Sequence, residues 1–305
     1  MNFKATLREA LTSWKGNPPA DLLPDVPPQP RISRCIHQIF FSDGGVNMPP
    51  ELERNVEHIR RLNPDWEHRL YGAEDMVAFI RHHYDERVLG YFERINPAFG
   101  PARADLFRYL LLYRLGGVYL DIKSSLLRPL TAVLRPDDCY LLSRWHNKPG
   151  EDFAGWGLHP EIGDADGEFQ QWHIVAAAGH PFLRAVIRRV LRNIRRYDPL
   201  LHGQGWIGVI RATGPIAYTL AIQPLLSQHP HRIVDAQNEL GFQYSIYSSG
   251  GKSPHQRLFR AHYTQLEEPL VRQTAADRAF TRSLSVAKAV KAKLRIRAQR
   301  APAVK

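Results

Sequence analysis

The amino-acid sequence predicts an α/β fold built around a central, mostly parallel sheet. Short apolar runs of strand length alternate with segments of helical length between positions 34 and 123. A strand, a helix and a second strand in this order form a βαβ unit, whose strands lie parallel. The chain has 305 residues, of which 44% are hydrophobic, so it can bury a sizeable core. These observations fit one large α/β domain with helical additions, or two small domains.

Hydrophobic pattern and helix-breaking residues place the individual elements. We expect strands at residues 34–41, 66–71, 118–120, 138–145, 169–177, 233–247 and 257–263. We expect helices at residues 3–15, 50–62, 73–84, 85–95, 102–115, 180–197 and 213–226. The helix at 50–62 ends before Pro64, because the residue that precedes a proline avoids helical geometry. The helix at 102–115 ends at Gly116, because glycine adopts the left-handed cap conformation without a Cβ clash.

The two ends of the chain differ in composition from its middle. Residues 17–30 hold six prolines, which predicts a linker or an extended arm. From position 272 onward, ten Lys or Arg face one acidic residue, so this tail carries most of the net charge of +11. We expect an N-terminal helix and linker at 1–31, the main domain at 32–270 and a basic tail at 271–305.

Charge and composition also bear on partners and compartment. A basic tail is typical of contact with an anionic membrane or nucleic acid, or of a solvated end; we expect a membrane contact and not nucleic acid. Cys35 and Cys139 are too few for a disulfide framework or a zinc site. No apolar run approaches roughly 18 residues, and the N-terminus lacks an apolar signal core. The sequence therefore predicts a cytoplasmic protein, at most peripheral on the inner face of the membrane.

The segment 101–123 places charged side chains within an otherwise apolar stretch. Apolar residues cover nearly every face of the helix expected at 102–115, which predicts that this helix is buried. Asp105 and Arg108 are three residues apart and so lie side by side on it. Buried charges need a partner, so this pair is either a structural ion pair or part of a binding pocket.

Asp121 and Lys123 directly follow the short strand expected at 118–120. Because they are two residues apart on an extended chain, we expect both to point to the same side of the sheet. Ligands of open α/β sheets bind at the carboxyl ends of the strands. Together with Asp105 and Arg108, these residues predict a small, highly charged pocket that suits a phosphorylated ligand or a sugar.

The segment RADLFRYLLLYRLGGVYLD resembles the core signature of the DXD-motif sugar-binding glycosyltransferases, family 32 and its relatives. That family covers yeast-type mannosyltransferases and bacterial capsule or lipopolysaccharide transferases, and the large clostridial glucosylating toxins share its core. The segments CIHQIFF, LNPDWEHRLY, GHPFL and TGP match in order, so the resemblance spans roughly residues 36–219. It implies a GT-A type fold and transfer of a sugar from a nucleotide-sugar donor to a glycan or glycolipid acceptor. Retention of configuration and a place in cell-surface polysaccharide synthesis follow from the same resemblance.

The resemblance assigns roles to residues of the central segment. Asp105 and Arg108 would hold the hydroxyls of the donor sugar, and Arg103 would support them. Tyr119 would pack at the nucleotide-sugar, and Asp121 would orient the metal or the ribose. These five residues form the core of the expected site.

One departure from the family concerns the divalent cation, Mn²⁺ or Mg²⁺, that bridges the two donor phosphates. The family usually has Asp-x-Asp after the strand, whereas this chain has Asp121-Ile122-Lys123. An ammonium group close to the cation would repel it. We therefore expect Lys123 to weaken cation binding or to replace part of the role of the ion.

The resemblance also points to residues outside the central segment. His37 and Gln38 would contact the nucleotide, although residue type alone favours a hydrogen-bonded core pair. The helix that begins at Gly214 and Pro215 offers an N-terminus suited to a phosphate or polar sugar, or is an ordinary helix start. His262 is a candidate metal ligand, or a satisfied structural histidine. Further substrate-binding candidates lie on the run FQQWHIVAA: Gln171, Trp172 and His173.

Two further segments have a predicted role, and two other function classes stay open. Residues 146–168 hold five glycines without periodicity, which favours a functional loop, here an acceptor-side lid. The arginines of the helix at 180–197 are typical of a solvated face, with an acidic acceptor or membrane contact as the alternative. No Walker loop, GxGxxG, GxSxG or HExxH motif occurs. The alternatives are a catalytically silent nucleotide-sugar-binding paralogue, suggested by Lys123, and a basic membrane- or nucleic-acid-associated adaptor, suggested by the tail.

Overall fold

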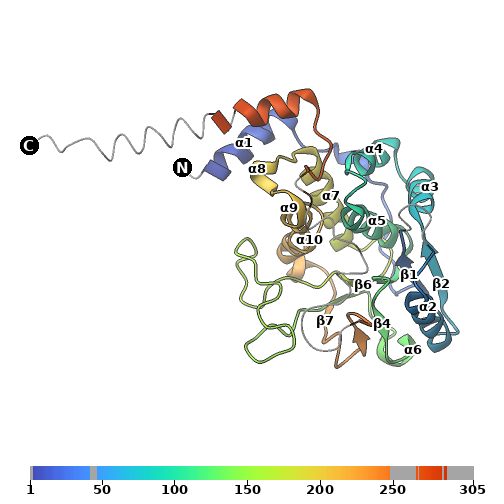
Figure 1. Cartoon of the computed structure of the whole chain (residues 1–305). Helices are drawn as coiled ribbons and strands as arrows, with labels where there is room; N and C mark the ends of the chain where they lie inside the picture. The colour runs from blue at the N-terminus through green and yellow to red at the C-terminus, as the bar shows by residue number, and fades with distance from the viewer. Residues whose placement is uncertain (1–2, 42–46, 248–265, 267, 284, 287–305) are drawn as a thin grey trace, which may run out of the picture.

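A six-stranded sheet with helices on both faces forms the centre of the molecule (Figure 1). The computed structural model describes residues 3–41, 47–247, 266, 268–283 and 285–286. The strand order is β2-β1-β3-β6-β5-β7. The bounds are β1 Cys35–Ile39, β2 Glu67–Tyr71, β3 Gly117–Leu120, β5 Tyr140–Leu142, β6 His173–Ala176 and β7 Arg232–Ile233.

The sheet is mixed, with one reversed strand. β1 pairs in parallel with β2 and β3, and β5 pairs in parallel with β7. β6 is antiparallel to both of its neighbours, β3 and β5. All strands of this sheet other than β6 therefore run in the same direction, and the predicted α/β class with a mostly parallel sheet is confirmed. A separate antiparallel pair joins β4, Ser125–Leu126, to β8, Phe242–Gln243.

The helices in the first half of the chain match the sequence prediction closely. Their bounds are α1 Phe3–Lys15, α2 Pro50–Leu62, α3 Ala73–His83, α4 Glu86–Arg94, α5 Gly100–Leu115 and α6 Leu130–Val133, with a 3₁₀ turn η1 at Ala20–Leu22. In the second half they are α7 Pro181–Arg195, α8 Pro199–His202, α9 Gly205–Ala212 and α10 Pro215–Ile222, with a 3₁₀ turn η3 at Gln223–Gln228. None of these helices is both long and apolar enough to cross a lipid bilayer.

The later part of the chain departs from the prediction. The strand expected at 233–247 is wrong, because this segment contains only β8 and the last residue of β7, separated by turns. The sequence gives no signal for β4, α8 or α9, which are short and follow no clear periodicity. The segment 146–168 contains neither helix nor strand, as predicted. The strand expected at 257–263 lies outside the described residues.

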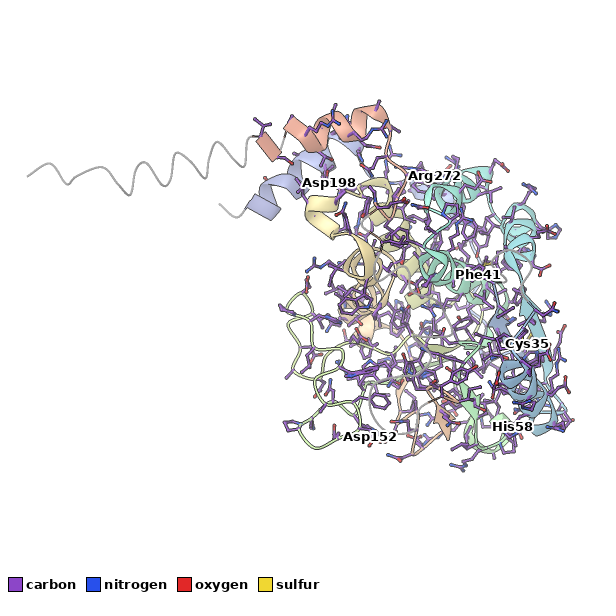
Figure 2. All side chains as sticks on the ribbon, viewed as in Figure 1. Cys35, Phe41, His58, Asp152, Asp198 and Arg272 are labelled. Carbon is purple, nitrogen blue, oxygen red and sulfur yellow. The ribbon has the colours of Figure 1, made fainter. Side chains whose placement is uncertain are left out.

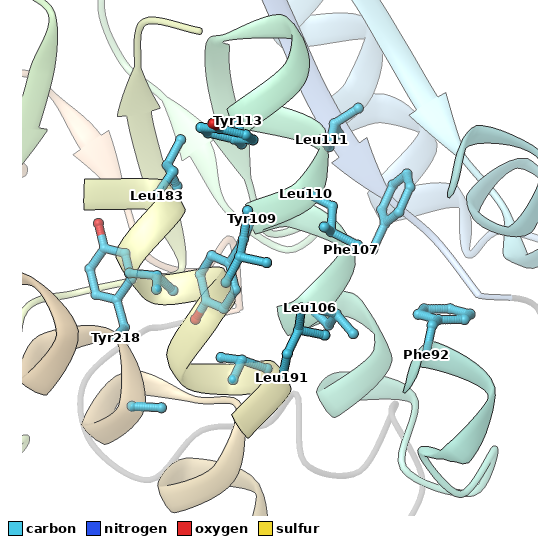
Figure 3. Close-up of a cluster of buried hydrophobic side chains, with 14 of the residues drawn as sticks. Phe92, Leu106, Phe107, Tyr109, Leu110, Leu111, Tyr113, Leu183, Leu191 and Tyr218 are labelled. Carbon is cyan, nitrogen blue, oxygen red and sulfur yellow. The ribbon is translucent and has the colours of Figure 1, made fainter. Parts of the chain in front are cut away.

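Two hydrophobic clusters cover the two faces of the sheet. The larger cluster joins α3, α4, α5, α7 and α10 to one face, which includes Tyr119 and Ile174. In Figure 3, Tyr109 of α5 lies between side chains of α7 and α10. The smaller cluster packs α2 and α6 against the other face, which includes Val118 and Leu120. α5 is therefore buried on all sides, as its apolar pattern predicts.

Two glycines allow α5 to turn directly into β3. Gly116 has φ 65° and Gly117 has φ 106°, conformations that L side chains rarely adopt. A Cβ atom on Gly117 would lie 2.4 Å from the carbonyl oxygen of Cys35, and one on Gly116 would lie 2.6 Å from the amide nitrogen of Ala178. This close packing fixes the position of β3 relative to β1 and α5.

Neither terminal segment stands apart from the domain in the structure. Leu22, Leu23 and Val26, from the proline-rich stretch, are buried in the main core. Residues 275–283 are helical and lie along α1 (Figure 1). Lys15 pairs with Asp277 over 2.6 Å. Figure 2 labels Asp198, which accepts a hydrogen bond from Thr281 at 2.7 Å and so joins this helical segment to α8.

Candidate active site

A buried charge pair on α5 forms the centre of the candidate site. Asp105 and Arg108 are 3% and 4% exposed, and Nη2 of the arginine donates to Oδ1 of the aspartate. Thr213, just before α10, donates its hydroxyl to the other carboxylate oxygen of Asp105 at 2.7 Å. Gln171 donates to Asp105 at 3.4 Å. Three donors from three segments therefore hold this carboxylate in place.

Tyr109 of α5 also contacts the segments that contain Gln171 and Thr213. Its hydroxyl lies within hydrogen-bond distance of Gln171 Oε1 and, at 3.0 Å, of the Thr213 carbonyl oxygen. Its ring stacks on that of Tyr218 from α10, with centroids 5.7 Å apart (Figure 3). Tyr109 and Thr213 are not predicted from the sequence, because a Tyr and a Thr in apolar surroundings carry no functional signal until the fold brings distant segments together.

Asp121 lies at the end of β3 and joins the charge pair. Arg108 Nη1 donates to Asp121 Oδ1 over 3.1 Å, so one guanidinium binds two carboxylates. Tyr119 donates its hydroxyl to the same oxygen at 2.9 Å. The side chain of Asp121 is 27% exposed, compared with 5% for that of Asp105. Asp121 is therefore the member of the cluster that a ligand can reach most easily.

The electrostatic environment fixes the protonation of the cluster. Burial raises the pKa of Asp105, against the lowering effect of Arg108 and of the Thr213 hydrogen bond. Burial alone would lower the pKa of Arg108, but Asp105, with the other acidic groups nearby, raises it well above its ordinary value. Burial also raises the pKa of Tyr109 and Tyr119 well above the ordinary value of a phenol. Both tyrosines therefore remain protonated hydrogen-bond donors at neutral pH.

Gln38 supports the backbone beside Asp121. It is fully buried, and its amide nitrogen donates to the main-chain carbonyl oxygen of Asp121 at 3.4 Å. His68 of β2 donates to its side-chain oxygen at 2.9 Å; burial lowers the pKa of this histidine to about 4, so its ring is neutral. The structure thus places Gln38 next to the site as a positioning residue.

Lys123 does not lie where the strand pattern predicts. The chain leaves the sheet after Leu120 and turns, with the Ser124 amide bound to the Asp121 carbonyl oxygen at 2.8 Å. The expectation that Asp121 and Lys123 share one side of the sheet is therefore wrong. Lys123 instead donates to the hydroxyl of Tyr244 at 2.9 Å, and its ammonium lies 4.1 Å from the centre of that ring.

An aromatic group surrounds Tyr244 beside the charged cluster. Trp145, Phe153 and Trp156 pack edge-on around it, with ring centroids 5.1 to 6.0 Å from its own. Trp172 joins this group at 5.5 Å. We call these five residues the aromatic shelf. Within it, the side chain of Trp156 is 42% exposed, so the shelf presents an open indole.

The structure places three of the predicted substrate-binding residues away from the charged cluster. His37 is fully buried, and its ring nitrogens lie 3.0 Å from the Tyr71 hydroxyl and from the Gly116 carbonyl oxygen. It is therefore a hydrogen-bonded core residue, as its residue type alone favours, and not a nucleotide contact. Arg103 binds the carbonyl oxygen of Ile95 at 3.1 Å and not the cluster. His173 pairs with Leu120 and so lies on the sheet face opposite Tyr119. Trp172 is buried, but its carbonyl oxygen accepts from the Asp121 amide at 2.8 Å, so it borders the site.

The remaining predicted residues have mixed positions. Gly214 precedes α10 and Pro215 begins it, directly after Thr213, so this helix starts beside Asp105. A Cβ on Gly214 would lie 2.8 Å from Ile210, so packing between α9 and α10 already requires glycine there. His262 lies outside the described residues.

The residues present fit a divalent cation held by a single protein carboxylate. Within the described part of the chain, no group of three or more His, Cys, Asp or Glu side chains is arranged to hold a metal ion. Among the described residues, Arg108 and Tyr119 donate to Oδ1 of Asp121, which leaves Oδ2 for a ligand. Mg²⁺ and Mn²⁺ take oxygen ligands, and Mg²⁺ is often bound through one or two carboxylates and the phosphates of the substrate. Asp121 can therefore contribute one ligand to a cation that the donor phosphates also bind.

Comparison with known protein families finds a match that includes the charged residues of α5 and β3. Residues 49–141, which contain α5, β3 and Asp121, match the family model described as "Glycosyltransferase sugar-binding region containing DXD motif". This part of the chain is therefore similar to the sugar-binding region of the DXD-motif glycosyltransferases. The α/β architecture fits the GT-A type that the sequence resemblance implies for this family.

Several curated relatives of this glycosyltransferase region are mannosyltransferases. Mannosyl phosphorylinositol ceramide synthase of Saccharomyces cerevisiae is 33% identical over 37% of this chain and 28% of its own length. Initiation-specific alpha-1,6-mannosyltransferase of Schizosaccharomyces pombe is 30% identical over 58% of this chain and 45% of its own. The chain thus spans less than half of the length of either relative. Among solved structures, it aligns with the UDP-bound glycosyltransferase domain from the YGT toxin at 9% identity and a TM-score of 0.48, over 84% of this chain and 90% of that one.

Proposed function

We propose that this protein is a retaining glycosyltransferase that moves a hexose, with mannose as the first candidate, from a nucleotide-sugar donor to a glycan or glycolipid acceptor. The observation that carries the proposal is the link between Asp105, Arg108 and Asp121 at the end of β3, within the matched sugar-binding region. The mannosyltransferase relatives support the choice of sugar.

The charges of the cluster suit a sugar with its diphosphate. Asp105 and Arg108 offset one another, so their oxygens and N–H groups can bind hydroxyls without a net charge. Arg108 Nε and Trp172 Nε1 are buried with no hydrogen-bond partner among the described residues. A buried unpaired N–H group costs about 1–3 kcal/mol, a cost that an oxygen of the donor would remove. We therefore assign these two groups to donor binding.

Leaving-group chemistry needs positive charge near Asp121. The departing diphosphate gains negative charge, and a divalent cation, when bound, stabilises it as a Lewis acid. Lys123 supplies a further positive charge on the turn after Asp121. Arg108 and Tyr119 hold Asp121 at one oxygen, so its orientation is set before the donor arrives. The residues of this chain thus position the reactants, which is a large share of catalysis in group transfer.

We propose the aromatic shelf as the acceptor side of the site. The apolar face of a sugar ring packs well on an aromatic ring. Trp156, in the loop 146–168, is exposed and can offer its indole for this contact. The loop is anchored by Arg144, which pairs with Asp164 over 2.7 Å, and by Arg211, which binds Glu161 at 2.7 Å. An anchored loop beside the cluster would also exclude water, which prevents hydrolysis of the donor.

The setting of the reaction is part of the same proposal. We place the protein in the cytoplasm, with a product that belongs to a cell-surface polysaccharide or glycolipid. The basic residues after position 272 favour peripheral contact with the anionic inner face of the membrane. Nucleic acid is not proposed as a partner.

A donor screen tests the function directly. UDP- and GDP-hexoses are compared by thermal shift with and without manganese, and the donor that binds is then assayed for transfer. A ligand at a hundredfold excess over its Kd raises the stability by about 2.7 kcal/mol. Transfer to a sugar acceptor, or slow hydrolysis of the donor, is the expected result. Binding without any turnover would favour the silent paralogue, which Lys123 makes the second candidate.

A further inference from the structure

A cavity of about 530 Å³ lies apart from the residues of the candidate active site. It is formed mainly by α7, α9 and α10, and Leu11 of α1 and Glu161 of the long loop also line it. The other lining residues are Arg189, Arg192, Asn193, Arg196, Leu201, His202, Arg211, Ile216 and Leu220. A volume of this size is typical of a small-molecule site. We call this cavity the arginine pocket.

The pocket gathers positive charge with little to balance it. Of the residues that the structure describes, four arginines line it, and Glu161 is the single acidic residue among them. Glu161 is already paired with Arg211, whose Nε donates to it at 2.7 Å. Burial, and then the nearby charges of Arg192 and Arg195, lower the pKa of Arg196, so like charges repel one another in this cavity. A bound anion would relieve this repulsion.

Three other arginines of α7 and its C-cap bind the N-terminal segment through their side chains, whereas Arg192 does not. Arg196 donates to the Gly16 carbonyl oxygen at 2.9 Å, and Arg195 donates to the carbonyl oxygen of Lys15, the last residue of α1. Arg188 donates to the Ala20 carbonyl oxygen at 2.7 Å. These three arginines therefore hold the N-terminal segment, and Arg188 is at the same time exposed to solvent as predicted. Arg192 lines the pocket, and its guanidinium makes no side-chain hydrogen bond or ion pair with any described residue.

The pocket also offers polar and apolar surface. The side-chain amide of Asn193 donates to the carbonyl oxygens of Arg211 and Ala212, at 3.3 and 3.0 Å, so its own oxygen remains an acceptor. That oxygen suits a hydroxyl group of a ligand. Leucine and isoleucine side chains from α1, α8 and α10 form the rest of the wall and suit the carbon skeleton.

We propose that the arginine pocket is a second binding site, which takes a phosphorylated polyol through the Arg192 guanidinium. Arginine presents a planar set of donors that matches the oxygens of a phosphate group. The ligand is either a soluble polyol phosphate or the phosphorylated headgroup of a lipid, which share this chemistry. α1 contributes Leu11 to the pocket wall, and the basic C-terminal part of the chain begins with the helical segment 275–283, which lies along α1 (Figure 1). The site does not depend on the transferase activity.

Two probes separate the two sources. The soluble probe is inositol 1-phosphate, measured by titration calorimetry. The lipid probe is a phosphatidylcholine vesicle with one fifth phosphatidylinositol, measured by co-sedimentation against pure phosphatidylcholine. Arg192→Gln removes the charge of the proposed ligand group. Arg81→Gln on α3 is the matched control, because Arg81 is exposed and lies outside the pocket.

We expect the loss of probe binding to be specific to the substitution of Arg192. Arg192→Gln should weaken binding of at least one probe by tenfold or more, whereas Arg81→Gln changes it less than twofold. A loss seen with inositol 1-phosphate alone identifies a soluble ligand, and one seen with vesicles alone identifies a lipid headgroup. Equal losses for both variants would mean general attraction by a basic protein and would overturn the proposal. Wild-type binding that is absent, or that Arg192→Gln leaves unchanged for both probes, would overturn it as well.

Discussion

Arg108 on α5 donates Nη1 to Oδ1 of Asp121 over 3.1 Å, although the two residues are thirteen positions apart and belong to different elements. This bond ties the buried helix to the end of β3. The same guanidinium also binds Asp105, so its position depends on two carboxylates at once. A planar, forked donor is the side chain that can satisfy both.

Replacing Arg108 by lysine should therefore remove activity while keeping the charge. A lysine has no fork and can hold one of the two carboxylates at a time. We expect transfer to fall to below about a tenth of the wild-type rate, a loss above ~1.4 kcal/mol in transition-state stabilisation. Losing one charged hydrogen bond should also lower the free energy of unfolding by about 1.5–3 kcal/mol. Urea unfolding and a donor-turnover assay measure the two effects.

Arg103→Lys is the matched control for that substitution. Arg103 lies on the same helix, but it binds the Ile95 carbonyl oxygen and packs over the ring of Phe92, outside the cluster. We expect this variant to keep most of its activity. If both variants retained more than a tenth of the wild-type rate, the assignment of Arg108 to the active site would be wrong.

Local signals explain how much of the fold the sequence predicts. Pro50 at the start of α2 and Asn63-Pro64 after it predict both ends of that helix, and the structure confirms them. Gly116-Gly117 likewise predicts the end of α5. In contrast, β7 and β8 have two residues each, so no hydrophobic alternation can develop in them.

The candidate site was predicted only in part, for a physical reason. Asp105, Arg108 and Asp121 stand out because charges within an apolar segment are unusual. Thr213 reaches Asp105 across 108 positions of sequence, a contact that only the tertiary fold creates. The turn after Asp121 sends Lys123 toward Tyr244, and strand periodicity does not describe a residue beyond the end of its strand.

Buried histidines should make the protein sensitive to mild acid. Burial lowers the pKa of His37 to about 4 and that of His173 to about 3, whereas both titrate near 6.5 in the unfolded chain. Their contribution to stability is therefore fully present above pH 6.5 and is lost as the pH falls toward 4. Within this pH window, each histidine should lower the free energy of unfolding by roughly 1.4 kcal/mol for each pH unit.

A comparison of variants isolates the histidine contribution. His37→Gln removes the titrating ring but retains a donor and an acceptor for Tyr71 and Gly116. The free energy of unfolding in urea, measured at pH 7.5 and pH 5, should fall less for this variant than for the wild type. Exposed His82→Gln should behave as the wild type does. Parallel losses in all three proteins would show that His37 is not a source of the acid sensitivity.

Removing the C-terminal segment from residue 272 onward should lower the melting temperature. Residues of this segment pair with α1 and α8, through the ion pair of Asp277 with Lys15 and the bond from Thr281 to Asp198. The ring of Phe280 also stacks on Trp14, with centroids 4.4 Å apart. Truncation after residue 286 keeps all of these contacts and should leave the melting temperature unchanged. Equal melting temperatures for the two truncated chains would contradict this expectation.

Lys123 should reduce the dependence of the reaction on a divalent cation. Its ammonium is held on the turn after Asp121 by Tyr244, where the family usually has a second aspartate. Two unit charges 4 Å apart interact by roughly 4 kcal/mol at an effective dielectric of 20, so a cation bound near Asp121 would be repelled. We expect Lys123→Asp to lower the manganese concentration for half-maximal turnover at least tenfold, with Lys123→Gln between it and the wild type. Turnover is measured against manganese after exhaustive chelation. If the chelated wild type were inactive and micromolar manganese restored it fully, Lys123 would not take over any role of the ion.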